Sequence, residues 1–222
     1  MNYHIITLFP QSLDSYLNES ILKRASEKGL IKFKFYNPRD FADGDSYAER
    51  RVDDKPYGGG PGMVIEALPV IKAIEKAVGK KIKDPKTKKK VKIIWLTPSG
   101  KQFDTVEAKN FAKKYTDIVF ICGRYEGIDA RVKKAFKVEE ISVGPFVLTG
   151  GELPTLVLID TISRQIKGVL GDYASLEESR IASPDVYTRP EIVEYKGKKY
   201  RVPKVLLSGN HKLIDEWKQN KK

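Results

Sequence analysis

The chain has 222 residues, 41% of them hydrophobic, which is enough to bury a substantial core as one large domain or as one domain with an appendage. Its 41 lysines and arginines exceed its 29 acidic residues, and the formal charge of +12 favours a polyanionic partner such as nucleic acid, although an anionic membrane or solubility alone would also account for it. The single cysteine, Cys122, excludes an internal disulfide and a cysteine-rich zinc site, and with His4 and His211 as the only histidines we expect no metal site.

The amino-terminal part predicts a strand, a helix and a second strand. Residues 3–9 are β-branched and aromatic, apolar residues from Leu13 to Leu22 recur at helical spacing up to Gly29, and residues 31–35 alternate as a strand does. The opening sequence has no basic region, and its apolar stretch is too short for a signal peptide or a membrane span. We therefore expect a cytoplasmic protein without a membrane partner.

A polar, glycine-rich segment at residues 37–63 is too long for a simple connector, and loops of this length are usually functional or disordered. Within it, Arg50 and Arg51 precede the sequence YGGGPGM, where glycine main chain could approach a phosphate or a base while guanidinium groups take the charge. The alternative is a solvated loop with its own ion pairs. No GK[ST] ending and no GxGxxG occur, so P-loop and dinucleotide interpretations lack their motifs.

Residues 67–78 carry a helical stripe that ends at Gly79, and a lysine run follows from Lys80 to Lys92 with Asp84 as its one acid. Such a run is usually a solvated loop. The alternative interpretation is a contact with a nucleic-acid backbone, and without interleaved aromatic residues the run would not read sequence.

Strands at 91–96 and 117–121 alternate with helices at 105–114, at 130–136 with Asp129 as the cap, and at 152–167. This order predicts an α/β fold with a mostly parallel sheet covered by helices on both faces. Three punctuated loops, LTPSG, CGRYEGID and VGPFVLTGG, each follow a strand. Ligands of parallel sheets bind at the carboxyl ends of strands, so these loops either meet around one small molecule or are ordinary strand-to-helix turns.

Beyond Gly168 the sequence predicts no sizeable second core. Residues 193–202 are typical of a hairpin around Gly197, and residues 213–218 of the start of a short terminal helix. In the helix expected at residues 152–167, Asp160 and Arg164 lie four residues apart. They could form an ordinary ion pair on the helix surface, or the carboxylate could hold the arginine so that it points into the pocket.

Seven segments in order, YGGGPGM, CGRYEGID, LTGGELP, IDTISR, GVLG, YTRPE and LLSGNH, resemble the bacterial tRNA (guanine-N1) methyltransferases of the SPOUT class. The resemblance implies S-adenosylmethionine as the methyl donor, a sheet domain tied as a deep trefoil knot, and a homodimer with active sites at the subunit interface. It implies a knotted domain at 1–167, a linker at 168–186 and a short tRNA-binding region at 187–222.

By the same resemblance the substrate is the guanine at tRNA position 37, next to the anticodon, and magnesium supports full activity. Glu126 and Arg164 match residues that hold this base, while Asp53, Tyr57, Gly58, Gly59 and Gly60 help to enclose it. The methyl-donor pocket falls on the three loops that the strand argument selects. Its residues are Leu96, Thr97, Pro98, Gly123, Tyr125, Val143, Gly144, Pro145, Phe146, Val147, Leu148, Gly150, Gly151 and Pro154.

The chain departs from the family pattern in three places. The family's catalytic aspartate after GVLG is matched best by Glu178, in a linker one residue shorter, with Glu177 as the alternative base. Pro145 stands where the family usually has an aspartate, and the carboxyl-terminal region is short. Two alternatives therefore remain: a catalytically weak relative that binds tRNA, or a methyltransferase of this class that acts on another RNA.

Overall fold

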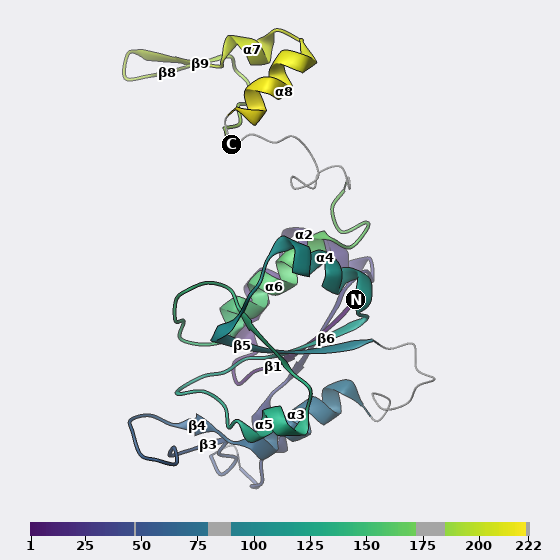
Figure 1. Ribbon diagram of the computed structural model, residues 1–222, viewed down its shortest axis with the longest axis vertical. Coiled ribbons are helices and arrows are strands. Elements are labelled where there is room, and N and C mark those ends of the chain that lie inside the picture. The colour runs from purple at the N-terminus through teal and green to yellow at the C-terminus, as the bar shows by residue number, and fades with distance from the viewer. Residues whose placement is uncertain (47, 80–89, 172–184, 221–222) are drawn as a thin grey trace. The chain divides into compact units, whose positions relative to one another are not determined.

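A computed structural model of the chain describes residues 1–46, 48–79, 90–171 and 185–220 (Figure 1). It divides into two compact units, Met1–Leu170 and Gly171–Lys222. The lysines between 80 and 89, and the linker residues Glu177 and Glu178, lie outside the described residues. Within the described ranges, no helix combines the length and the apolar character that crossing a membrane requires.

The first unit is built on a parallel five-stranded sheet with the strand order β2-β1-β6-β5-β7. The strands are β1 (Asn2–Ile6), β2 (Lys32–Tyr36), β5 (Val91–Gln102), β6 (Asp117–Ile121) and β7 (Glu139–Ser142). All five residues of the central strand β6 are buried, because helices cover both of its faces. The predicted parallel α/β sheet is confirmed.

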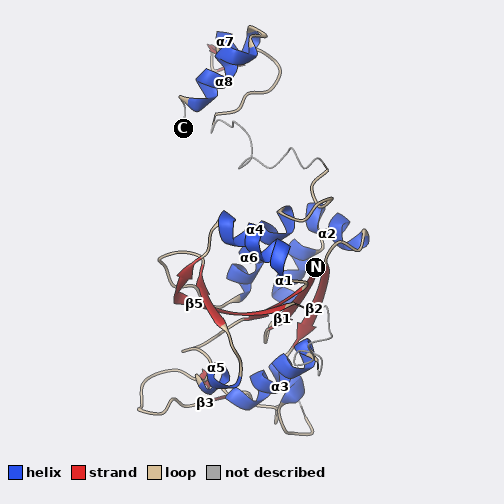
Figure 2. Ribbon diagram, turned by 45° about the vertical axis from the view of Figure 1, so that its right-hand side comes forward, coloured by secondary structure: helices blue, strands red, loops and turns tan. Residues whose placement is uncertain are grey.

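Helices cover the two faces of this sheet in two groups (Figure 2). One face carries α1 (Gln11–Leu17), α2 (Ser20–Glu27), α4 (Thr105–Lys114) and α6 (Glu152–Arg164), and the other carries α3 (Ala67–Val78) and α5 (Arg131–Ala135). Side chains of β6 alternate between the two hydrophobic cores: Ile118 and Phe120 enter one, Val119 and Ile121 the other. The knot expected from the resemblance stays a prediction.

Two local predictions were wrong. The single helix expected between Leu13 and Gly29 is two helices, α1 and α2, and the second begins at Ser20 with a φ of 50°. The turn expected at LTPSG is an irregularity inside β5, since Leu96 and Lys101 both pair with Ile141 and the four residues between them bulge.

Short elements connect the strands of the first unit. A 3-10 helix, η1 (Pro38–Phe41), precedes a two-stranded antiparallel ribbon of β3 (Asp53–Asp54) and β4 (Val64–Ile65). The N-cap of α5 is Ala130 and not Asp129 as predicted, although the Asp129 carboxylate accepts a hydrogen bond from the Arg131 backbone N–H at 2.8 Å.

The second unit contains an antiparallel hairpin of β8 (Ile192–Tyr195) and β9 (Lys198–Arg201), followed by α7 (Lys204–Leu207) and α8 (His211–Gln219). The rings of Tyr187 and Trp217 pack with their centroids 6.3 Å apart. The predicted hairpin and terminal helix are confirmed.

Candidate functional site

A cavity of about 450 Å³ opens beside the bulge of β5 and where β6 and β7 end. Its walls come from the three segments that follow or interrupt these strands: residues 95–98, 123–130 and 141–151. Parallel strands end at the same edge of a sheet, which is why loops far apart in sequence meet here.

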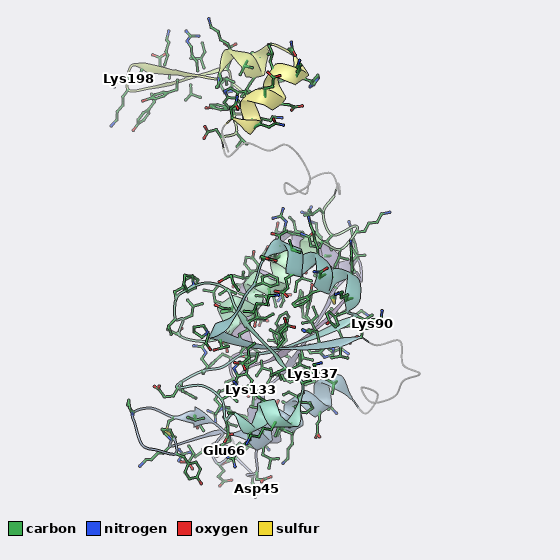
Figure 3. The ribbon with its side chains drawn as sticks, in the orientation of Figure 1. Asp45, Glu66, Lys90, Lys133, Lys137 and Lys198 are labelled. Atoms are coloured by element: carbon green, nitrogen blue, oxygen red, sulfur yellow. The ribbon has the colours of Figure 1, made fainter. Side chains whose placement is uncertain are left out.

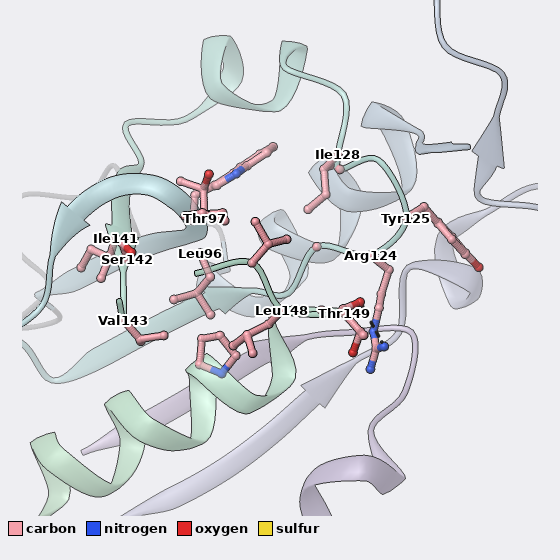
Figure 4. A pocket seen from close by; sticks show the side chains of 18 of the residues that line it. Leu96, Thr97, Arg124, Tyr125, Ile128, Ile141, Ser142, Val143, Leu148 and Thr149 are labelled. Atoms are coloured by element: carbon pink, nitrogen blue, oxygen red, sulfur yellow. Dashed lines mark hydrogen bonds between the residues drawn. The ribbon is translucent and has the colours of Figure 1, made fainter. Parts of the chain in front are cut away.

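The inner part of the cavity is apolar. Leu96, Val143 and Leu148 lie together (Figure 4), and Ile141 and Pro154 add to the same wall. Main chain without a Cβ forms other parts of the lining, at Gly123, Gly144, Gly150 and Gly151. An apolar slot beside exposed peptide groups suits a flat heteroaromatic ring with donors and acceptors at its edge.

The structure places the predicted donor-pocket residues together. All of them line this cavity except Pro145, although its two neighbours in the chain, Gly144 and Phe146, do line it. Tyr125 has a φ of 58°, and its ring points away from the apolar wall (Figure 4). Their role in cofactor binding stays a prediction.

Close packing explains why glycine is needed at Gly151. A Cβ there would lie 2.6 Å from the Cα of Cys122, a backbone atom that cannot move aside cheaply. Gly151 also donates its backbone N–H to the Gly123 carbonyl at 3.0 Å. The start of α6 is therefore pressed directly against the end of β6, and this contact closes one side of the cavity.

A buried ion pair, which the sequence argument missed, lies beneath the cavity. Glu152, the first residue of α6, is only 4% exposed, and its Oε1 accepts a hydrogen bond from the Thr7 hydroxyl at 2.6 Å. Its Oε2 lies 2.9 Å from Arg124 Nε, without the alignment of a hydrogen bond. The Arg124 guanidinium also lies over the Phe9 ring at 4.8 Å and donates to the Thr149 carbonyl at 3.3 Å.

This network ties the cavity to β1. Arg124 and Thr149 lie side by side (Figure 4), so the guanidinium links the loop after β6 to the loop before α6. The sequence held the signal, since Arg124 and Glu152 both stand in glycine-rich motifs, but their pairing depends on a contact between residues 28 positions apart along the chain.

The glycine-rich loop before β4 is attached to the loop after β6. Glu126 donates its backbone N–H to the Met63 carbonyl at 3.0 Å, and Ile65 donates to the Gly127 carbonyl at 3.0 Å. Gly62 has a φ of 82°, and a Cβ on it would lie 2.7 Å from the Glu126 Cγ. The side chain of Glu126, predicted to hold the substrate base, packs against Gly62, and Glu126 is one of the residues that line the cavity.

The other residues predicted to enclose the substrate lie in the same loop. Asp53 belongs to β3 and pairs with Ile65, while the Tyr57 side chain is 99% exposed. Gly58, Gly59 and Gly60 all have positive φ, a conformation that glycine adopts without strain. None of these five residues lines the cavity itself. A role in enclosing a substrate stays a prediction.

The structure does not bring Arg164 to this cavity. Pro154, near the start of α6, lines the cavity, and Arg164 ends the same helix about 15 Å further along its axis. The Asp160 carboxylate accepts a short hydrogen bond from the Tyr16 hydroxyl at 2.5 Å. The aiming of Arg164 by Asp160 stays a prediction.

Two titratable groups beside the cavity are perturbed. Burial raises the pKa of the Cys122 thiol far above its ordinary value of 9.0, so the thiol stays neutral. Hydrogen bonds from Arg131 lower the pKa of the Asp129 carboxyl from its ordinary value of 3.8. Across the described ranges, no group of three or more His, Cys, Asp and Glu residues is arranged to hold a metal ion.

Comparison with known proteins gives one consistent result. The family model described as tRNA (Guanine-1)-methyltransferase TrmD matches residues 1–222. A tRNA (guanine-N(1)-)-methyltransferase of Clostridioides difficile (strain 630) is 45% identical over 224 residues, covering 99% of this chain and 91% of that protein. One of Campylobacter jejuni subsp. doylei is 44% identical over 96% of this chain and 88% of that protein. One of Anoxybacillus flavithermus is 43% identical over 99% of this chain and 85% of that protein.

Proposed function

The chain belongs to the tRNA (guanine-1)-methyltransferase family, and we propose that it methylates N1 of the guanine at position 37 of tRNA, next to the anticodon. The methyl donor of this family is S-adenosylmethionine. The single observation that carries the proposal is the glycine-walled cavity beside the bulge of β5 and the carboxyl ends of β6 and β7, two of whose segments contain the family motifs CGRYEGID and LTGGELP.

The residues present fit S-adenosylmethionine. A cavity of about 450 Å³ lies in the range of small-molecule sites, and its apolar wall of Leu96, Val143 and Leu148 suits the two faces of an adenine ring. Glycine main chain at Gly123 and Gly150 leaves peptide groups open to its edge. When bound, S-adenosylmethionine supplies an activated methyl group on its sulfonium. The protein therefore has to align the accepting nitrogen and to manage one proton.

The proton is the main chemical problem, because guanine N1 carries a hydrogen and is a poor nucleophile. We assign its removal to the Glu178 carboxylate, with Arg164 stabilising the negative charge that develops on O6. The residues that line the cavity would hold the donor, which would supply the methyl group to N1, and the Glu178 carboxylate would take the proton that N1 gives up. Glu126, at the rim of the cavity, is suited to accept hydrogen bonds from the guanine edge.

The position of Arg164 supports an active site shared between two subunits. Arg164 ends α6 about 15 Å beyond Pro154, so one chain cannot place this cation at its own cavity. We propose a homodimer in which Arg164 and Glu178 of each subunit serve the cavity of the other. The cavity, Glu126 and the glycine-rich loop would then come from one subunit, and the cation and the base from its partner.

A mixed dimer tests this arrangement directly. One subunit carries Arg164→Ala with an intact cavity, and the other carries Leu148→Trp, which fills the cavity, with an intact Arg164. A shared site leaves one complete site in the mixed dimer and about half of the wild-type activity per dimer. Sites made within one chain leave none, which would refute the shared arrangement.

The reaction is tested by transfer of a labelled methyl group from S-adenosylmethionine to tRNA with guanine at position 37, beside the same tRNA with adenine there. Glu178→Gln removes the base and keeps its shape, and Glu177→Gln is the matched control. We expect transfer that needs the guanine, falls at least about a hundredfold in Glu178→Gln and survives in Glu177→Gln. The reverse result would move the base to Glu177. A titration of the rate against free magnesium tests the metal requirement implied by the family.

Two outcomes would support other functions. Absence of methyl transfer, with S-adenosylmethionine and tRNA both bound, would identify a tRNA-binding relative that lacks catalysis. Transfer to ribosomal RNA fragments in preference to tRNA would identify a methyltransferase of the same class with another substrate.

A further inference from the structure

The loop between β7 and α6, residues 143–151, forms one wall of the cavity. Among the residues that the structure describes, the middle of this loop, residues 145–150, makes one hydrogen bond, which the Arg124 guanidinium donates to the Thr149 carbonyl at 3.3 Å. At the end of the loop, the backbone N–H of Gly151 donates to a carbonyl of the loop after β6. The position of the middle of the loop therefore depends on one side chain.

The same guanidinium packs against the main chain of the loop. A Cβ on Gly150 would lie 2.3 Å from Arg124 Nε and 2.6 Å from Arg124 Cδ. The φ of Gly150 is not in the positive range, so this close approach, and not the backbone conformation, is what requires glycine at this position. Arg124 therefore lies directly on the backbone of the loop, in addition to donating to its carbonyl.

Arg124 is itself held by groups outside the loop. Glu152 Oε2 lies 2.9 Å from Arg124 Nε, and the Phe9 ring lies 4.8 Å from the guanidinium carbon. The Thr7 hydroxyl accepts a hydrogen bond from the Phe9 backbone N–H at 2.9 Å and donates to Glu152 Oε1 at 2.6 Å. These contacts join the guanidinium to the end of β1 and to the start of α6, so its position is set by the sheet and the helix.

A second cation that lines the cavity contacts different groups. Lys133, labelled on α5 in Figure 3, has its ammonium 3.0 Å from the Glu140 carboxylate and 5.1 Å from the centre of the Trp95 ring. These partners belong to β7 and β5, and not to the loop. In the described part of the chain, the contact between a cation and the main chain of this loop is therefore made by Arg124.

We propose that Arg124 is a positioning residue of the methyl-donor pocket, which holds residues 145–150 in the conformation that binds the donor. A loop that is held in advance does not have to be ordered when the ligand binds, so less conformational entropy is lost on binding. The inference rests on the proposed function for the identity of the donor as S-adenosylmethionine. It assigns to Arg124 an effect on donor affinity that acts through the loop.

The test measures binding of S-adenosylhomocysteine, the donor without its methyl group, to the full-length protein by calorimetry. Arg124→Lys keeps a cation beside Glu152 but removes the planar group that contacts the loop. Arg131→Lys is the matched control, because the Arg131 guanidinium also donates to a carboxylate, that of Asp129 at 2.6 Å, and Arg131 is not among the residues that line the cavity. Thermal unfolding of each variant is measured under the same conditions.

We expect Arg124→Lys to bind S-adenosylhomocysteine at least about tenfold more weakly than the wild type does. The loss should be equal for methylthioadenosine, which lacks the amino-acid part, because a displaced loop changes the pocket for both ligands. The KM for S-adenosylmethionine should rise by a similar factor, while kcat at saturating donor and tRNA affinity stay within about threefold of the wild-type values. Arg131→Lys should bind both ligands as the wild type does.

Unchanged affinity in Arg124→Lys would overturn the inference. A loss confined to S-adenosylhomocysteine would also overturn it, because it would show that Arg124 pairs directly with the carboxylate of the donor. An equal loss in Arg131→Lys would do the same, since it would show that any change beside the cavity weakens binding.

A second variant covers the case in which Arg124→Lys does not fold. Arg124→Met combined with Glu152→Gln removes both charges and leaves no buried charge without its partner. It should show the same loss of affinity for both ligands, and wild-type affinity in this variant would refute the positioning role. Wild-type protein that binds S-adenosylhomocysteine no better than these variants rejects only this role, whereas wild-type protein that neither binds it nor methylates tRNA rejects the proposed function itself.

Discussion

Replacing Glu152 with alanine should lower the free energy of unfolding of the first unit by more than the loss of an exposed ion pair would. The variant leaves the Arg124 guanidinium, whose side chain is 25% exposed, without its carboxylate 2.9 Å away, and it removes the acceptor of the Thr7 hydroxyl. Opposite charges at this distance attract by about 6 kcal/mol at an effective dielectric constant near 20, before desolvation is counted. Removing one partner of a buried pair costs about 3–5 kcal/mol.

We therefore expect Glu152→Ala to lower the free energy of unfolding by about 3 kcal/mol, near the lower end of that range because Arg124 retains some contact with water. For a unit of this size the loss corresponds to a fall of about 6–12 °C in Tm. The assay is thermal and urea unfolding followed by circular dichroism. Glu140→Ala is the matched control, since it breaks a 3.0 Å pair with Lys133 whose side chains are 33% and 40% exposed, more than those of Arg124 and Glu152, and it should cost no more than about 1 kcal/mol.

A double variant separates the buried charge from the lost packing. Arg124→Ala combined with Glu152→Ala removes the stranded cation, so its loss should be smaller than the sum of the two single losses by about 1–3 kcal/mol. Additive losses, together with a Glu152→Ala effect no larger than that of Glu140→Ala, would refute the reasoning.

Three further predictions follow from single residues. Gly151→Ala places a Cβ 2.6 Å from the Cα of Cys122 and should cost at least about 2 kcal/mol in urea unfolding, with weaker S-adenosylmethionine binding; a stable variant that binds normally would contradict this packing. Gly62→Ala should lower kcat for methyl transfer by about tenfold, because it displaces the Glu126 side chain, and should lower Tm by about 2–4 °C, because alanine is strained at a φ of 82°; an unchanged kcat would separate Glu126 from the reaction. Burial raises the pKa of the Cys122 thiol in the folded state, so stability is full below its ordinary value of 9.0 and falls as the pH rises above it; a thiol reagent should modify Cys122 only after unfolding, and rapid labelling of folded protein would be the contrary result.

The local pattern of the sequence was sufficient for most elements. The stretch DIVFI is uninterrupted and apolar except at its first residue, as a strand buried on both faces must be, and β6 is that strand. The rule that ligands bind where parallel strands end also selected three segments that meet at one cavity, of which the two after β6 and β7 are loops at strand ends. The family resemblance, which rests on seven motifs, is confirmed by relatives that cover nearly the whole chain.

Other features could not be read from local pattern. The periodicity from Leu13 to Leu22 is the same for one helix or for two, and a positive φ at Ser20 decides for two. Proline and glycine in LTPSG indicate a turn, but pairing with β7 on both sides keeps these residues inside β5 as a bulge. Arg164 lies in one of the family motifs, yet it ends α6 and is not among the residues that line the cavity of its own chain.

By itself the sequence determined the alternation of strands and helices, the glycines that shape the loops, and the family, because these depend on residues close together in the chain. Only the tertiary structure decided which strands are neighbours, and hence that β6 lies between β1 and β5. It also decided that Glu152 accepts a hydrogen bond from Thr7, 145 residues earlier. A buried carboxylate must find partners wherever the fold brings them, and no spacing along the chain specifies which residues those will be.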